Sequence, residues 1–301
     1  MMKRWMAALL ALCLGLLPGL AMGSMAVDED DQSHYTLPVT DSPGQPINEK
    51  FFLSDLEYED PTLKFIVTSG QWGGCSYWLA DIEIADASQL RTTSADGWDS
   101  NGVTSATRMA QRMNAVLAIN GDYFSFRGID YVIRQGTPYL NHLRGTRDVL
   151  VIDEDGDFHG FEAPERKDLG ETVDGKKIIN GFFFGPLIIN NGKVRQGGYS
   201  GQWMASDTGS QRMAIAQTGH LKYRVICVGP PAGKDNPKGL TLEKFRQFIA
   251  EMDDILVAYN LDGGDSTYLI VNGKKVNYPE NNNARDIADI IYFASAYPAD
   301  Q

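Results

Sequence analysis

The chain has 301 residues, and its 27 Lys and Arg side chains against 39 Asp and Glu side chains give a formal charge of −12. Hydrophobic residues make up 43% and charged residues 22%, as in ordinary globular proteins, which excludes a mostly disordered chain. The 31 glycines follow no three-residue period, which excludes a collagen-like fibre. Nucleic-acid binding needs a basic face, so the acidic balance argues against a nucleic-acid partner.

Residues 1–26 are typical of a secretory signal peptide. Two basic residues precede an apolar run from Trp5 to Leu17, Pro18-Gly19 ends that run, and small residues near positions 23 and 26 offer cleavage sites. The run is short for a full membrane span, although an uncleaved anchor helix is the alternative. We expect an exported protein, periplasmic or extracellular, with no transmembrane span in the mature chain.

Residues 27–50 are acidic and rich in Pro, Asp and Ser, which predicts a flexible arm, either a tether or a loosely docked segment. Residues 51–301 then form one domain. Cleavage removes Cys13 and leaves Cys75 and Cys227, which in an exported chain either form one disulfide or stay as two buried thiols. The absence of a Cys-x-x-Cys motif excludes a zinc ribbon and a redox motif.

The domain reads as mostly β. The first half of the domain predicts a strand at 77–84, a helix at 104–114, a strand at 115–119, and hairpins that turn at 135–136, 155–156 and 191–192. The second half predicts paired strands at 214–217 and 222–228, a helix capped by Thr241, a buried strand at 255–261, and a hairpin that turns at 272–273. The acidic run 153–157 predicts an ordinary hairpin, because its glycine is misplaced for a calcium loop. We expect an α+β fold: a β-rich single domain with a twisted mixed or antiparallel sheet, several hairpins and a few flanking helices.

Polar residues stand at the ends of apolar runs in four places, each of which has a plain-turn alternative. These groups are Asn120-Gly121-Asp122, Gln211-Arg212, Asn260 to Thr267, and Arg285 with Asp289. A strand ending in Asp262-Gly263-Gly264 brings bare backbone close to whatever lies beyond it, and successive N–H groups there can bind an anion. The third group therefore predicts a phosphate cradle beside a catalytic carboxylate.

Six motifs occur in order over roughly residues 75–295. They are Asn120-Gly121-Asp122-Tyr123-Phe124, Gly185-Pro186-Leu187, Arg212-Met213-Ala214-Ile215, Leu240-Thr241-Leu242, Asn260-Leu261-Asp262-Gly263-Gly264-Asp265-Ser266, and Arg285 with Asp289. This set resembles the phosphodiester glycosidase family, which includes the enzyme that uncovers mannose 6-phosphate by removing N-acetylglucosamine. The resemblance implies a secreted hydrolase that cleaves the glycosidic bond of a sugar-1-phosphodiester, N-acetylglucosaminyl or related, on glycans or on envelope or exopolysaccharide polymers.

The resemblance also implies roles for particular residues. Asp262 is expected to act as base or nucleophile, and Asp122 and Asp289 as a second carboxylate or as cation ligands. The expected substrate-binding residues are Arg212 and Arg285 for the phosphate, with Gly263, Gly264, Ser266 and Thr267 in support, and Asn120 and Asn260 for sugar hydroxyls or neighbouring loops. Whether configuration is retained or inverted depends on the separation of the carboxylates.

The chain departs from the family pattern at three positions. Asp265 stands where the family usually has a third glycine, Asp122 stands where it often has a small residue, and Asp289 stands where it often has an Asn. We expect no required cofactor, but the added carboxylates leave room for a bound divalent cation.

Other functions stay open at this point. A non-catalytic glycan or phosphoglycan binder on the same scaffold would use the same side chains. A serine hydrolase using Ser266 would lack the second glycine of a nucleophile elbow, and a zinc hydrolase would lack a His-Glu-x-x-His motif.

Overall fold

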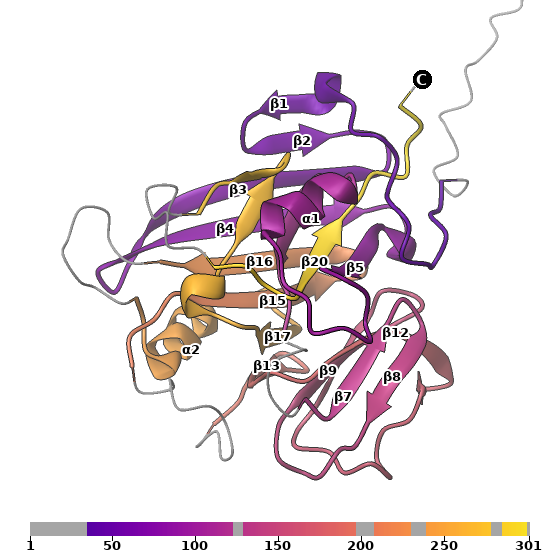
Figure 1. Ribbon diagram of the computed structural model, residues 1–301. Helices are drawn as coiled ribbons and strands as arrows, with labels where there is room; N and C mark the ends of the chain where they lie inside the picture. Colours follow the sequence, from indigo (N-terminus) through magenta and orange to yellow (C-terminus); the bar gives the residue numbers. More distant parts are fainter. Residues whose placement is uncertain (1–34, 123–128, 197–207, 230–238, 278–284, 300–301) are drawn as a thin grey trace, which may run out of the picture. The chain divides into compact units, whose positions relative to one another are not determined.

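Three antiparallel sheets form the body of the protein (Figure 1). The computed structural model describes residues 35–122, 129–196, 208–229, 239–277 and 285–299. The predicted signal peptide and Tyr123-Phe124 of the first motif lie outside the described residues. Residues 32–301 group into one compact unit. No helix in the described ranges is both long and apolar enough to cross a bilayer.

The largest sheet has nine strands. In spatial order they are β1 (Phe52–Ser54), β2 (Glu57–Glu59), β3 (Leu63–Trp72), β4 (Cys75–Ile84), β16 (Lys222–Val228), β15 (Arg212–Gly219), β17 (Val257–Asn260), β13 (Leu187–Asn190) and β14 (Lys193–Val194). Side chains alternate between the two faces, so Phe65 and Ile82 point inward while Lys64 and Glu83 reach solvent.

The other two sheets are smaller. The five-stranded sheet has the order β19 (Lys274–Lys275), β18 (Leu269–Val271), β6 (Leu117–Asn120), β20 (Asp289–Phe293) and β5 (Leu90–Ser94). The six-stranded sheet has the order β10 (Phe158–Phe161), β9 (Val149–Asp153), β12 (Lys176–Phe182), β7 (Tyr131–Arg134) and β8 (Thr137–Asn141), with β11 (Thr172–Val173) paired to β12.

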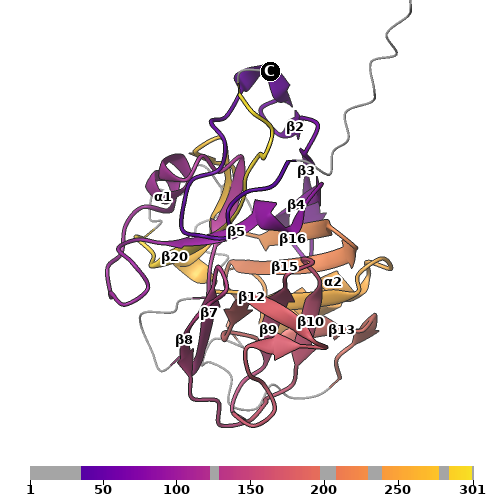
Figure 2. The same ribbon diagram turned by 90° about the vertical axis from the view of Figure 1, so that its right-hand side faces the viewer.

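One apolar core joins all three sheets, with Phe65, Leu117 and Leu150 among its members. Helix α1 (Ala106–Arg112) packs on the outer side of β20 (Figure 2). Helix α2 (Leu242–Ala250) covers part of the outer face of the nine-stranded sheet. The rest of the regular structure is three short 3-10 turns in the described residues: η2 (Glu49–Phe51), η3 (Ala87–Gln89) and η4 (Gly264–Ser266).

The structure confirms the predicted β-rich fold with few helices. The expected hairpins form, and Asn191-Gly192 and Asn272-Gly273 both have positive φ, the turn geometry that matches strand twist. Helix α2 begins as predicted, with the Thr241 hydroxyl accepting from Lys244 N at 3.2 Å. The single sheet that we expected is instead three sheets, and all their described strand pairs are antiparallel.

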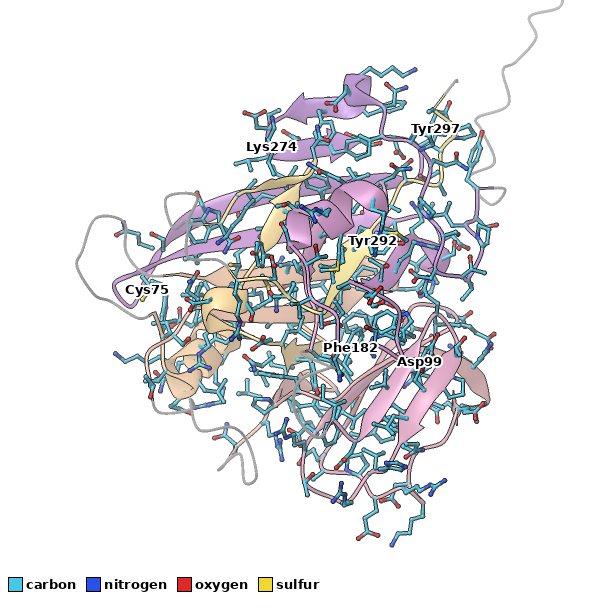
Figure 3. The ribbon with its side chains drawn as sticks, viewed as in Figure 1. Cys75, Asp99, Phe182, Lys274, Tyr292 and Tyr297 are labelled. Carbon is cyan, nitrogen blue, oxygen red and sulfur yellow. The ribbon has the colours of Figure 1, made fainter. Side chains whose placement is uncertain are left out.

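The described part of the expected flexible arm, residues 35–50, is docked on the body. Leu37 is buried, and its N–H donates to the Ser88 hydroxyl at 2.8 Å. The carbonyls of residues 38, 40 and 42 all accept from Nη2 of the buried Arg91, whose Nε donates to the hydroxyl of Tyr292, labelled in Figure 3. Composition indicated solvation, but a buried guanidinium needs these acceptors.

Both described cysteines are free and buried. Of the two alternatives left open by the sequence, the structure therefore has two buried thiols rather than a disulfide between Cys75 and Cys227. Burial raises the pKa of the Cys227 thiol to about 12, which keeps it protonated and unreactive.

Candidate functional site

The polar groups predicted from the sequence gather at one edge of the fold. Strands β6 and β17 end at Asn120 and Asn260, and β15 and β20 begin at Arg212 and Asp289. Ala214 pairs with Asn260 and Ile290 pairs with Asn120, both antiparallel. The end of β17 therefore lies beside the start of β15, and the end of β6 lies beside the start of β20. The segment after Asn260 then lies against both sheets.

Asp262 is at the centre of this edge. Its Oδ1 accepts from Gly263 N at 2.8 Å, and its Oδ2 lies 3.6 Å from Nη2 of Arg285. The main-chain carbonyl of Asp262 accepts from Asn120 Nδ2 at 2.9 Å. Burial raises the pKa of the Asp262 carboxyl, while hydrogen bonds from Ser266 and Gly263 and the charge of Arg285 act in the opposite direction.

The turn at Gly263 and Gly264 positions Asp262, and the N–H groups of both glycines donate hydrogen bonds within the protein. Gly263 N donates to Asp262, and Gly264 N donates to Gln211 O at 2.9 Å. A Cβ on Gly263 would lie 2.5 Å from Gln211 O, so only glycine fits there. The predicted anion cradle of Gly263 and Gly264 N–H groups is therefore directed inward, to the protein's own acceptors.

The two predicted phosphate-binding arginines differ in their exposure. The Arg285 side chain is 48% exposed beside Asp262, and its Nε donates to the Ser266 hydroxyl at 2.7 Å. Arg212 is buried, donating through Nε to Leu240 O at 3.0 Å and through Nη2 to Thr208 O at 2.9 Å. Burial lowers the pKa of Arg212 to about 10, so it stays charged near neutral pH. Arg285 is thus the better placed of the two to bind a ligand.

Asp122 and Asp289 lie behind Asp262, around a buried arginine. Arg134 Nη2 is 2.7 Å from Asp122 Oδ1 and 3.6 Å from Asp289 Oδ2, and Asp122 Oδ2 also accepts from Phe183 N. The guanidinium lies over the rings of Trp98 and Phe182, 5.1 and 4.3 Å from their centroids. Arg134 thus joins the six-stranded sheet to the strand ends of the five-stranded sheet.

The three predicted carboxylates differ in how much of each side chain is exposed to solvent. The side chains of Asp122 and Asp289 are 0% and 2% exposed, and that of Asp262 is 13% exposed. Burial and the neighbouring Asp122 charge raise the pKa of Asp289 to about 7. Of the three, Asp262 is the carboxylate that a substrate can reach.

The asparagines hold the loops around Asp262. Asn120 Oδ1 accepts from Tyr268 N at 3.1 Å, and Asn260 Nδ2 donates to Gly185 O at 2.7 Å. Several buried polar atoms around the edge have no hydrogen-bond partner in the described structure: Gln211 Oε1, Asn260 Oδ1, Thr267 Oγ1 and Asp289 Oδ2. Buried polar atoms without partners are costly, and their concentration here is typical of a binding site.

Two of the three added carboxylates that suggested a divalent cation, Asp122 and Asp289, lie beside the guanidinium of Arg134. Within the described ranges, no three His, Cys, Asp or Glu side chains are grouped as metal ligands.

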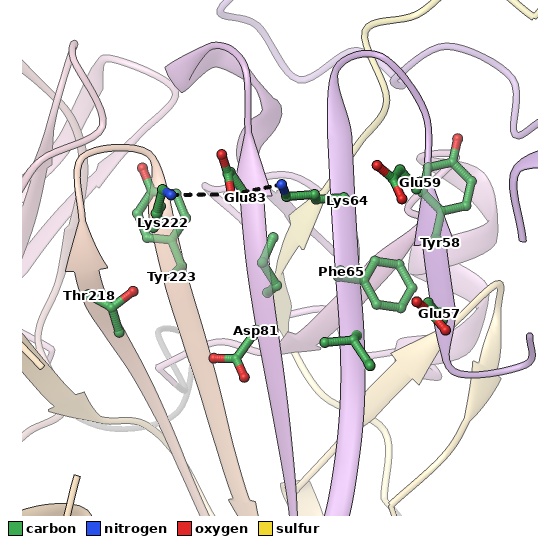
Figure 4. A pocket seen from close by; sticks show the side chains of 12 residues that line it. Glu57, Tyr58, Glu59, Lys64, Phe65, Asp81, Glu83, Thr218, Lys222 and Tyr223 are labelled. Atoms are coloured by element: carbon green, nitrogen blue, oxygen red, sulfur yellow. Dashed lines mark ion pairs between the residues drawn. The ribbon is translucent and has the colours of Figure 1, made fainter. Parts of the chain in front are cut away.

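A hollow of about 320 Å³ lies elsewhere, over strands β2, β3, β4 and β16 (Figure 4). Both lysines that line it are paired with Glu83, whose Oε2 lies 3.1 Å from Lys64 Nζ and 3.4 Å from Lys222 Nζ. It contains none of the predicted site residues, so we place the candidate site at Asp262.

The fold and the site together define a β-rich protein with a reachable carboxylate and an exposed arginine at a sheet edge. The profile of the phosphodiester glycosidase family matches residues 113–294, and the chain belongs to this family. A search of the curated proteins found no match.

Two solved structures have a similar fold. The first is the catalytic domain of zebrafish N-acetylglucosamine-1-phosphodiester alpha-N-acetylglucosaminidase, auto-inhibited by its pro-peptide, with 18% identity and a TM-score of 0.60 over 89% of this chain and 99% of that one. The second is a hypothetical protein from Synechocystis, with 15% identity and a TM-score of 0.51 over 77% of this chain and 62% of that one.

Sequence reasoning missed Arg134, the residue that organises the two buried carboxylates. The available signal was a charged residue closing the apolar run Tyr131–Ile133. A charge at the end of a buried strand needs a partner, and Asp122 was one of the acidic residues that could supply it.

Proposed function

We propose that the protein hydrolyses the glycosidic C1–O bond of a sugar-1-phosphodiester, releasing the free sugar and a phosphate monoester. The observation that carries this is the pairing of the reachable Asp262 carboxylate with the exposed Arg285 guanidinium 3.6 Å away. Family membership supports the reaction class.

The single reachable carboxylate suits this leaving group. Ordinary glycosides need a second carboxylic acid to protonate a poor alkoxide leaving group. A phosphodiester leaves as a weakly basic anion, so it needs charge stabilisation rather than a proton. Arg285 supplies that charge, and Asp262 acts at C1, as nucleophile or as the base for water.

The buried carboxylates and asparagines then support the reacting groups. Asp122 and Asp289 with Arg134 hold the strand ends, and Asn120 fixes the backbone of Asp262. The unpartnered Thr267 Oγ1 and Asn260 Oδ1 are buried behind Asp262, where ordered water can satisfy them.

The substrate that we propose is an N-acetylglucosaminyl or related 1-phosphodiester on a glycan or an envelope polymer. The signal-peptide pattern of residues 1–26 supports an exported protein that meets such polymers in the periplasm or outside the cell.

The test uses the methyl diester of N-acetylglucosamine 1-phosphate. Asp262→Asn should reduce turnover by at least 1,000-fold, the order expected for loss of a group essential to the chemistry, while the variant keeps the wild-type melting temperature. Asp286→Asn, an exposed carboxylate in the neighbouring segment, is the matched control. Turnover by Asp262→Asn close to that of wild type would refute the proposal. Proton NMR of the first sugar released shows whether configuration is retained.

A further inference from the structure

Ser266 connects the two reacting groups. It is the last residue of η4 and is fully buried, and its Oγ accepts from Arg285 Nε at 2.7 Å. A guanidinium only donates, so the hydroxyl proton of Ser266 is left to donate elsewhere. The carboxylate beside this pair is Asp262, whose Oδ2 lies 3.6 Å from Nη2 of the same Arg285 guanidinium, and hydrogen bonding from Ser266 acts to lower its pKa.

We propose that Ser266 is a positioning residue that fixes the Asp262 carboxylate and the Arg285 guanidinium relative to each other, without touching the substrate. This inference rests on the proposed function, because it assigns Ser266 a role in the same reaction. It also replaces the expectation that Ser266 binds substrate directly.

The geometry disfavours Ser266 as a nucleophile. Its side chain is 0% exposed, and the guanidinium of Arg285 engages an Oγ lone pair that a nucleophile would direct at the substrate. A positively charged donor also lowers the nucleophilicity of the oxygen. The serine hydrolase alternative therefore lacks an available attacking atom.

The backbone around Ser266 is held independently of its hydroxyl. Ser266 N donates to Gly263 O at 3.2 Å, and Arg285 N donates to Asp265 O at 3.2 Å. The Arg285 carbonyl accepts from the Tyr268 hydroxyl at 2.9 Å. Removing the Ser266 hydroxyl should thus release the two side chains while the main chain stays in place.

Ser266→Ala should therefore lower kcat/KM for the methyl diester by on the order of 100-fold, the scale of a small misplacement of reacting groups. Loss of the hydrogen bond also raises the pKa of Asp262 further, so the acid limb of the kcat/KM profile should move to higher pH. The control is Ser295→Ala, another buried serine, beyond the opposite end of β20, which should leave both quantities unchanged.

A second variant tests the link to Arg285. Arg285→Lys keeps the charge but lacks the Nε–H, so combining it with Ser266→Ala should cost less than the product of the two separate losses. An unshifted acid limb with kcat/KM within about twofold of wild type would overturn the inference. A loss as complete as that of Asp262→Asn would assign Ser266 to the chemistry itself and overturn it too. Activity in Asp262→Asn would instead overturn the proposed function.

Discussion

The pair of buried carboxylates should make the stability of the protein depend on pH in a specific way. Asp122 is held by Arg134 at 2.7 Å and by Phe183 N, whereas Asp289 Oδ2 lies 3.6 Å from the same guanidinium. Burial and the charge of Asp122 raise the pKa of Asp289, although Arg134 and a backbone hydrogen bond from Asp122 act in the opposite direction. The pKa of Asp289 is about 7 in the folded protein, against an ordinary value of 3.8.

The direction and the size of the change in stability with pH follow from the linkage between proton binding and folding. Between about pH 4 and pH 7 the folded protein keeps a proton that the unfolded chain has released, so this contribution to stability falls as the pH rises and is level above about pH 7. Each pH unit is worth about 1.4 kcal/mol, so the whole window contributes at most about 4 kcal/mol.

Asp289→Asn removes this titration. We expect the free energy of unfolding of the variant, relative to wild type, to rise by up to about 4 kcal/mol between pH 4 and pH 8. Urea unfolding at one-unit pH intervals, followed by tryptophan fluorescence, measures it, and the exposed Asp286→Asn is the matched control. A difference between Asp289→Asn and wild type that stays constant from pH 4 to pH 8 would refute the reasoning.

Two further predictions concern the same buried cluster. Arg134→Met should destabilise the fold by about 3–5 kcal/mol, because it leaves two carboxylates without their cation. Combining it with Asp122→Asn and Asp289→Asn should recover part of that loss in chemical denaturation, and no recovery would mean that the charge is not the cause. Gly121→Ala should cost about 1–3 kcal/mol in the same assay, since its Cβ would lie 2.0 Å from Asp289 Oδ2 and force the carboxylate to move. A neutral effect would show that the carboxylate relocates freely.

Local signals in the sequence predicted most of the elements, since each depends on neighbouring residues. Asn-Gly turns and the Thr241 cap specify their geometry within four or five residues. The division into three sheets depends on pairing between strands far apart in the chain, such as β6 with β20. No short window encodes such pairing, so it was not predicted.

In the candidate site, too, the local features were predicted from the sequence and the long-range contacts were not. The strand end at Asp262 and its glycine turn were readable because the motif is contiguous. The contacts of individual side chains were not predicted, such as the hydrogen bonds that Arg212 donates to the main-chain carbonyls of Leu240 and Thr208. Such contacts follow from packing around each residue rather than from its neighbours in sequence.

The docking of residues 35–50 sets a practical limit on where the polypeptide can be shortened. Three of the acceptors of Arg91 are carbonyls of residues 38, 40 and 42. A recombinant version starting at residue 51 would leave that guanidinium buried without these three hydrogen-bond acceptors. Expression should therefore begin upstream of Tyr35, even though the arm supplies none of the residues that we place at the catalytic edge.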